Sequence, residues 1–172
     1  MKKIQTTLIA NQITTTDSDA YTLLEKSNFG TKLPNKISYS PHETLYLLQT
    51  NKITIQNFQN KPLTEPDCIK KFTSQNKNFT IQYPVFKDLT EKGYSVKTAL
   101  KFGTDFRVYT KTKPKTTHAK WLCQTIQENT KITPQTFSAK NRVANSTNKD
   151  LLLAIVDNEN KITYYTCSWT QP

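Results

Sequence analysis

The chain has 172 residues and a formal net charge of +11, from 24 Lys and Arg against 13 Asp and Glu, with a pI near 9.5. Its hydrophobic content of 35% is enough for a packed core and excludes intrinsic disorder, and no run approaches the roughly 20 apolar residues of a membrane span. Three scattered cysteines and three glycines argue against a disulfide framework, a zinc site or a Gly-rich phosphate loop. We therefore expect a cytoplasmic protein without a signal peptide or membrane association.

The positive charge is unevenly distributed along the chain. Up to Gln82, 10 Lys face 6 acidic residues, whereas beyond it 12 Lys and 2 Arg face 7 acidic residues. Charge alone fits two interpretations equally well, a lysine-rich soluble protein or a protein with a polyanionic partner such as nucleic acid.

The first part of the chain predicts a small α/β domain. Ser40 before Pro41, with Glu43 three residues after the serine, is typical of a helix start with a capping box. The Asn- and Lys-rich stretch 74–78 reads as a linker, so we predict an N-terminal domain over residues 1–80 and a C-terminal domain over 81–172. The elements expected in the first domain are a strand over 4–10, the helix from Ser40 to about 50, a strand over 53–55 and a helix over about 66–73.

The second part predicts the order α-β-β-β-α-β-β. Phe106 and Val108 alternate with Asp105, Arg107 and Tyr109, which is typical of a strand with one buried face. The fold class is therefore α/β (α+β), with a C-terminal mixed sheet flanked by helices. The expected elements are a helix over 83–92 ended by Gly93, strands over 94–98 and 105–111, a basic loop over 111–117, a strand over 119–126, a helix from Thr133 to about 146, a buried strand over 151–156, a turn over 157–160 and a strand over 162–169.

Two histidines are present, and only one is a candidate for chemistry. His42 lies inside the capping box and is interpreted as structural. His118 follows the basic loop and opens a strand near solvent. A hairpin would place Tyr109 and His118 on either side of that loop, and Lys149 ends the helix before the buried strand. These three side chains can then meet at one edge of the sheet.

Several blocks in the second part resemble the archaeal tRNA-intron (splicing) endonucleases. The run from Tyr94 to Tyr109 resembles the signature of that family, and the order and spacing of the other blocks agree with it. The resemblance covers about 83–172 well and is fainter before that, mainly over 45–55. The remaining blocks are Asp88-Leu89, Lys92-Gly93-Tyr94, His118 with Trp121-Leu122, Arg142 to Lys149 with 151–157, and 162–165.

The resemblance implies an endoribonuclease, a tRNA-intron lyase. Members of the family cut precursor tRNA at intron boundaries folded as a bulge-helix-bulge, and leave a 2′,3′-cyclic phosphate and a 5′-hydroxyl. The implied fold is an α/β N-terminal domain followed by a catalytic domain with a restriction-endonuclease-like sheet. Attack by the adjacent 2′-hydroxyl needs no external water, so neither metal nor cofactor is implied.

By position, the resemblance implies that Tyr109 is the general base, His118 the general acid, and Lys149 the group that stabilises the charged transition state. Arg142 matches an arginine that stacks on a bulge nucleotide. Histidine and lysine suit these roles at neutral pH. A phenol is only about one part in a thousand ionised at pH 7, so a tyrosine base needs neighbouring cations. Candidates for these are Lys111, Lys113 and Lys115.

The sequence departs from the family pattern at a few positions. Asn145 stands where the family commonly has His, Asn148 where it has Arg, and Thr104 where it has Ala. Asp157 and Glu159 resemble an acidic loop that inserts into a neighbouring subunit, but they also fit an ordinary solvated turn. Arg107 is interpreted either as a structural ion-pair partner or as a phosphate contact.

Two other functions remain open. The chain is either a catalytic subunit or a non-catalytic RNA-binding subunit, although non-catalytic members typically lack the triad. A metal-dependent nuclease would need paired carboxylates, whereas Asp105 is the only acidic residue in the central strands.

The functional unit of the family carries four such folds, so the expected partners are precursor tRNA and either identical chains, in a homotetramer, or a related non-catalytic chain, in a heterotetramer. Aromatic residues of the last strand fit a dimer interface or the core of the domain itself. These are Tyr164, Tyr165 and Trp169.

Overall fold

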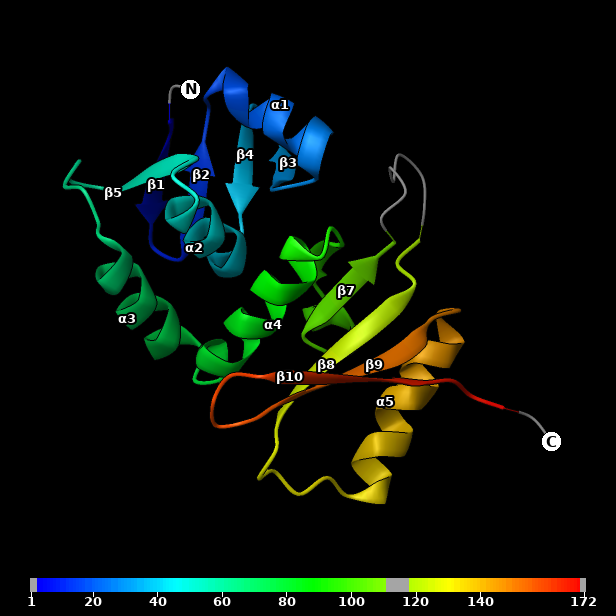
Figure 1. The fold of residues 1–172 in the computed structure, drawn as a ribbon. Helices are drawn as coiled ribbons and strands as arrows, with labels where there is room; N and C mark the ends of the chain where they lie inside the picture. Colours follow the sequence, from blue (N-terminus) through cyan, green and yellow to red (C-terminus); the bar gives the residue numbers. More distant parts are fainter. Residues whose placement is uncertain (1–2, 111–117, 171–172) are drawn as a thin grey trace. The chain divides into compact units, whose positions relative to one another are not determined.

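The computed structural model describes residues 3–110 and 118–170, and the chain forms two compact units, Met1–Phe79 and Thr80–Pro172 (Figure 1). Each unit contains a five-stranded mixed sheet with helices packed against it. This confirms the predicted α/β (α+β) class.

The sheet of the first unit has the strand order β3-β4-β2-β1-β5, with β1 and β5 parallel and all other neighbours antiparallel. Alternating residues of β1 and β5, among them Leu8 and Ile55, are buried, as the β-branched pattern predicts. The bounds are β1 Ile4–Ile9, β2 Gln12–Thr15, α1 Ser18–Ser27, β3 Thr31–Leu33, β4 Lys36–Tyr39, α2 Pro41–Gln49, β5 Ile53–Asn57 and α3 Glu65–Gln75.

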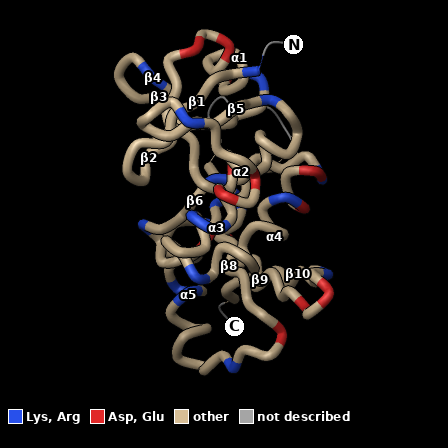
Figure 2. Tube along the Cα trace, turned by 90° about the vertical axis from the view of Figure 1, so that its left-hand side faces the viewer, with Lys and Arg blue, Asp and Glu red and all other residues tan. Residues whose placement is uncertain are grey.

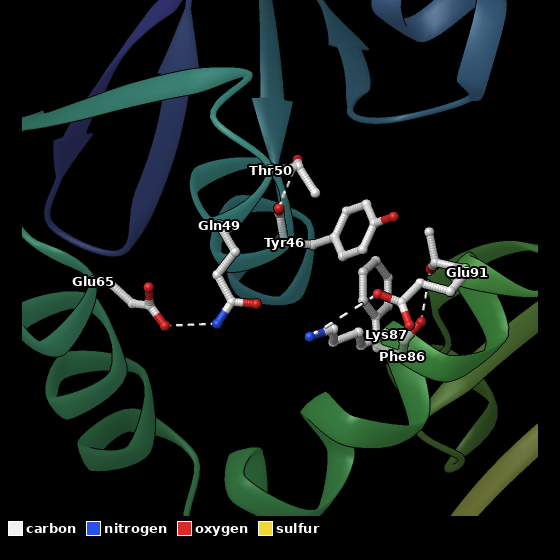
Figure 3. Close-up of polar contacts among 8 residues, drawn as sticks. Tyr46, Gln49, Thr50, Glu65, Phe86, Lys87 and Glu91 are labelled. Atoms are coloured by element: carbon white, nitrogen blue, oxygen red, sulfur yellow. Dashed lines mark hydrogen bonds and ion pairs between the residues drawn. The ribbon is translucent and has the colours of Figure 1, made fainter.

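The start of α2 confirms the predicted capping box. The Glu43 backbone N–H donates to the Ser40 hydroxyl, and the Glu43 carboxylate accepts from the Ser40 N–H. At the other end of the helix, the Gln49 amide donates to the Glu65 carboxylate at 2.6 Å and ties α2 to α3 (Figure 3). His42 is buried, with its ring centroid 4.9 Å from that of Phe79, which confirms a structural position.

The sheet of the second unit has the strand order β10-β9-β8-β7-β6, in which β8 and β9 are parallel and all other neighbours are antiparallel. The connection between the parallel strands runs through α5, and the sequence order of the elements is the predicted one. The bounds are α4 Phe79–Glu91, β6 Ser95–Thr98, a 3₁₀ turn η1 Leu100–Phe102, β7 Phe106–Tyr109, β8 Trp121–Gln127, α5 Pro134–Ser146, β9 Asp150–Val156 and β10 Ile162–Cys167.

The two helices of this unit pack on opposite faces of its sheet. On one face, Phe86 of α4 contacts Phe106 of β7, with ring centroids 5.9 Å apart. On the other face, Ala144 of α5 packs with Leu122 and Leu151 in a fully buried cluster. Because both faces are covered, β9 is an almost continuous apolar run, as predicted.

Several predicted boundaries are wrong. The linker over 74–78 is shorter, because α3 continues to Gln75 and α4 begins at Phe79 rather than at Tyr83. Phe79 is buried against Phe72, and burial of this ring favours a helix start before Tyr83. The last strand ends at Cys167 rather than at 169, and the first residue of the predicted strand 105–111 lies before β7. Lys111 itself lies outside the described residues.

Candidate active site

Strands β7, β8 and β9 are aligned at one end of the second sheet. Trp121 of β8 pairs with Val108 of β7 on one side and with Asp150 of β9 on the other. Just before β8, the Lys120 N–H donates to the Val108 carbonyl at 2.9 Å, and the Lys120 carbonyl accepts from the Asp150 N–H at 3.1 Å. One residue, Lys120, therefore joins the end of β7 to the start of β9.

The three candidate catalytic residues lie next to this junction. Tyr109 is the last residue of β7 and is half-buried, His118 is exposed two residues before Lys120, and Lys149 directly precedes β9. Their backbones are thus at the same end of the sheet, and their chemical roles stay predictions. Three residues that we expected to assist the tyrosine lie outside the described residues: Lys111, Lys113 and Lys115.

The end of α5 explains how Lys149 reaches this place. Asn148 has a φ of 54°, in the left-handed region, and its N–H donates to the Asn145 carbonyl. The Lys149 N–H then donates to the Ala144 carbonyl at 2.9 Å, which completes a Schellman-type helix end. Asparagine tolerates this conformation better than most residues. The conformation therefore explains why asparagine fits at position 148, where the family commonly has arginine.

The side chains of Lys149 and Arg107 share one neighbour. The Lys149 Nζ lies 5.8 Å and the Arg107 Cζ 6.0 Å from the centroid of the Phe102 ring. Arg107 also donates from Nε to the Thr98 carbonyl at 3.3 Å. These two contacts give Arg107 a structural position next to Lys149, and its role as a phosphate contact stays a prediction. Sequence reasoning missed Phe102, because η1 was not predicted and a phenylalanine carries no chemical signal of its own.

Arg142 lies on the exposed side of α5, and Asn145 is exposed one turn later. In contrast, Lys140 reaches inward and donates from Nζ to the Gly103 carbonyl at 2.8 Å and to the Gln124 side chain at 2.7 Å. Figure 2 shows basic residues along β6 and α5 and acidic ones at the turn between β9 and β10. We call Lys97 of β6 together with Lys140 and Arg142 of α5 the basic side of this unit, and the turn also carries one basic residue, Lys161, next to Glu159.

Asp105 serves the internal structure of the second unit. Its carboxylate accepts hydrogen bonds from the Gln82 and Gln124 amides and from both the N–H and the hydroxyl of Thr125, at 2.6 to 2.9 Å. Within residues 3–110 and 118–170, no three His, Cys, Asp or Glu side chains are grouped as metal ligands. The residue before Asp105 is Thr104, whose buried hydroxyl has no hydrogen-bond partner in the described part of the chain. Leaving a buried hydroxyl without a hydrogen bond lowers stability, and an alanine at this position would avoid that loss.

The turn between β9 and β10 is ordered by its own side chains. The Asp157 carboxylate accepts from the Glu159 and Lys161 N–H groups, both at 2.8 Å, and the Lys161 ammonium pairs with the Glu159 carboxylate at 2.6 Å. Glu159 is exposed at the tip of the turn. The internal contacts of this turn explain its conformation without a partner.

Comparison with known proteins decides the family. Residues 79–164 match the family described as "tRNA intron endonuclease, catalytic C-terminal domain", and residues 4–69 match "tRNA intron endonuclease, N-terminal domain". The chain belongs to the tRNA intron endonuclease family. Among its relatives, the tRNA-splicing endonucleases of Thermococcus gammatolerans and Methanococcus vannielii are 33% and 32% identical to it over 95% of this chain and 96% and 93% of theirs. That of Pyrococcus abyssi is 35% identical over 86% of this chain and 84% of its own.

Membership of the tRNA intron endonuclease family confirms the resemblance found in the sequence, including its fainter N-terminal part. The two matched segments fall within the two units, apart from Phe79 at their border. In the part of the chain that the structure describes, each helix is too short or too polar to cross a membrane.

Proposed function

We propose that the chain is a catalytic tRNA-splicing endoribonuclease subunit, a tRNA-intron lyase. Its substrate is precursor tRNA folded as a bulge-helix-bulge at the intron boundaries. The catalytic domain is the C-terminal part, residues 81–172, and the first 80 residues form the N-terminal domain. The observation that carries this proposal is the junction at Lys120, which holds the backbones of Tyr109, His118 and Lys149 at one end of a sheet.

Each of the three residues has a defined role in the proposed reaction. Tyr109 takes the proton of the ribose 2′-hydroxyl at the cleavage site, and the 2′-oxygen forms a bond to phosphorus. The bond from phosphorus to the 5′-oxygen breaks, and His118 gives a proton to that oxygen. Lys149 stabilises the negative charge that develops on the phosphate oxygens. The products are a 2′,3′-cyclic phosphate and a 5′-hydroxyl, and no metal takes part.

RNA binding is proposed to depend on the basic side of the second unit. Arg142 is exposed on α5, and a guanidinium plane both stacks on a base and pairs with phosphate. Lysines supply affinity that depends on salt and not on sequence. Such a surface suits recognition of an RNA shape.

We propose that the active species contains four folds of this kind, from identical chains or from pairs with a related chain. Exposed aromatic residues support association through β10 and the residues just after it. Tyr165 is 54% and Trp169 53% exposed. In contrast, Tyr164 is half-buried and donates its hydroxyl to Asp88 at 2.7 Å within the same unit.

The proposal is tested with the chain expressed alone and a bulge-helix-bulge RNA, in buffer with EDTA. We expect cleavage at both intron boundaries, with ends that carry a cyclic phosphate and a 5′-hydroxyl. Tyr109→Phe, His118→Ala and Lys149→Met should each slow the single-turnover rate by about a hundredfold or more. Tyr21→Phe is the matched control for the phenol, since Tyr21 lies on α1 of the first unit.

Three results would contradict the proposal in different ways. Dependence on a divalent cation would favour a metal-dependent nuclease. His118→Ala with an unchanged cleavage rate would remove the assigned acid. The third result is that the chain alone binds the RNA without cutting it, and that cleavage begins once a related chain is added. If the three substitutions then leave that cleavage unchanged, the chain is a non-catalytic subunit. The native mass distinguishes a homotetramer from a dimer that needs a partner.

A further inference from the structure

The Phe102 ring lies beneath two cations. The Lys149 ammonium is 5.8 Å and the Arg107 guanidinium carbon 6.0 Å from its centroid, both within the range in which a cation is attracted to the face of an aromatic ring. The two cations come from different elements, Arg107 from β7 and Lys149 from the segment between α5 and β9. The ring is therefore a shared contact of residues that are 42 positions apart in sequence.

Each cation has a second anchor on the backbone. The Lys149 Nζ donates to the Thr147 carbonyl at 2.6 Å, and the Arg107 Nε donates to the Thr98 carbonyl at 3.3 Å. A lysine side chain has four rotatable bonds, and one hydrogen bond leaves its ammonium free to swing. The ring face supplies the second contact that narrows the position of the Lys149 ammonium.

The ring itself is held in place from two sides. It packs against the buried cluster of Leu122, Ala144 and Leu151. The next residue, Gly103, has a φ of +66° and accepts a hydrogen bond from the Lys140 ammonium through its carbonyl. Phe102 is thus fixed both to the sheet and to α5. A group that orients another side chain must itself be held in place, and Phe102 meets this requirement.

We propose that Phe102 is a positioning residue for Lys149, and that its ring face holds the Lys149 ammonium where negative charge develops on the scissile phosphate. This inference rests on the proposed function, in which Lys149 acts in the transition state. Phe102 does not touch the reacting atoms. Its effect is on the rate of the chemical step and not on RNA affinity.

A series of fluorinated phenylalanines at position 102 tests the inference. Fluorine atoms weaken the negative potential of the ring face and change its shape little. Two measurements are made on the full chain in its active assembly: the single-turnover cleavage rate at saturating bulge-helix-bulge RNA, and the Kd for the same RNA with 2′-deoxyribose at the cleavage sites. We expect the rate to fall stepwise with each added fluorine, by about two- to fivefold overall, and the Kd to stay constant.

Matched variants assign the effect to one cation. In a Lys149→Met background the fluorine dependence should disappear, whereas in an Arg107→Met background it should persist. The same fluorinated series at Phe137, which packs against the same cluster, should leave the rate unchanged. Phe102→Leu should slow cleavage and Phe102→Tyr should restore it, provided that the urea midpoints of both variants match that of the parent chain.

The outcomes separate this inference from the proposed function. A flat rate across the series, with Lys149→Met still slow, would overturn the role of Phe102 and leave the proposed function intact. A Lys149→Met chain that cleaves at the parent rate would overturn both. A series that changes the Kd and not the rate would show that Phe102 serves RNA binding or folding, and this also overturns the inference.

Discussion

The backbone N–H of Lys120 donates to the carbonyl of Val108 at 2.9 Å, and the Lys120 carbonyl accepts from the N–H of Asp150 at the start of β9. The bond to Val108 fixes the spacing between the last residue of β7 and the segment that carries His118. Since this hydrogen bond is made by the backbone, the cleavage rate should depend on the N–H of Lys120 more than on its side chain.

We therefore expect Lys120→Pro, which has no N–H, to lower the single-turnover rate by about tenfold or more, because small misplacements of catalytic groups are costly. Lys120→Ala keeps the N–H and is the control, with a rate near that of the parent chain and a weaker salt dependence of RNA binding. Equal rates for the two variants would show that this hydrogen bond does not position the site.

Arg142 provides a test of base stacking. Arg142→Lys keeps the positive charge but loses the guanidinium plane, so we expect binding of bulge-helix-bulge RNA to weaken by about 1–3 kcal/mol. Binding of the same RNA with abasic bulge positions should be equal for the two proteins. Lys131→Ala, an exposed change just before α5, controls for general charge. An Arg142→Lys chain that binds intact bulges as well as the parent would contradict stacking.

Asp105 is expected to stabilise the second unit. In Asp105→Asn, an NH₂ group faces donors that now contact a carboxylate, so unfolding should become easier by about 2–3 kcal/mol. Both tryptophans of the chain, Trp121 and Trp169, lie in this unit, so their fluorescence in urea reports its unfolding. Glu128→Gln changes an exposed carboxylate and should leave the urea midpoint within experimental error.

We expect the second unit to lose stability at high pH because of Tyr164. Burial, and then the hydrogen bond to the Asp88 carboxylate, raise the pKa of Tyr164 above its ordinary value near 10. Below about pH 10 the phenol is protonated in both the folded and the unfolded chain, and above it the unfolded chain loses the proton first. The free energy of unfolding of the second unit should therefore fall as the pH rises above about 10.

In Tyr164→Phe this decline should be shallower, while stability at pH 7 drops by about 1 kcal/mol from the lost hydrogen bond. The remaining decline has a separate source, since burial raises the pKa of the Cys123 thiol in the same unit. Urea unfolding of both proteins between pH 7 and 11 measures the difference. Parallel curves for the two proteins would mean that Tyr164 titrates alike in the folded and unfolded chain.

Local sequence signals predicted most of the secondary structure. The capping box at Ser40 and Glu43 formed as expected, and so did the alternation of Phe106 and Val108 with Arg107 and Tyr109. These signals work because hydrogen bonds across three residues and side-chain alternation depend only on neighbours in sequence. None of the elements between residues 11 and 39 was predicted. The strands β2, β3 and β4 have only three or four residues each and become stable in the sheet that they form, and the ten-residue helix α1 fully buries only Ala20, so it has little apolar periodicity to detect.

The candidate site divides in the same way. The run from Tyr94 to Tyr109 and the later blocks are present in the sequence and together indicate the family, and that resemblance points to Tyr109, His118 and Lys149. The contact of Lys149 and Arg107 with Phe102 was not predictable, because a cation–π contact has no sequence spacing and depends on where η1 packs.

The sequence by itself therefore determined the fold class, the family and the three candidate catalytic residues, because motifs and hydrophobic periodicity are local properties of the chain. The tertiary structure decided which positive charges gain a defined place. Of the 24 basic residues behind the net charge of +11, Arg107 and Lys149 share the Phe102 ring, and Lys140 ties Gly103 to α5. The physical reason is that a lysine or arginine is confined only where packing brings an aromatic ring or a carbonyl oxygen within its reach.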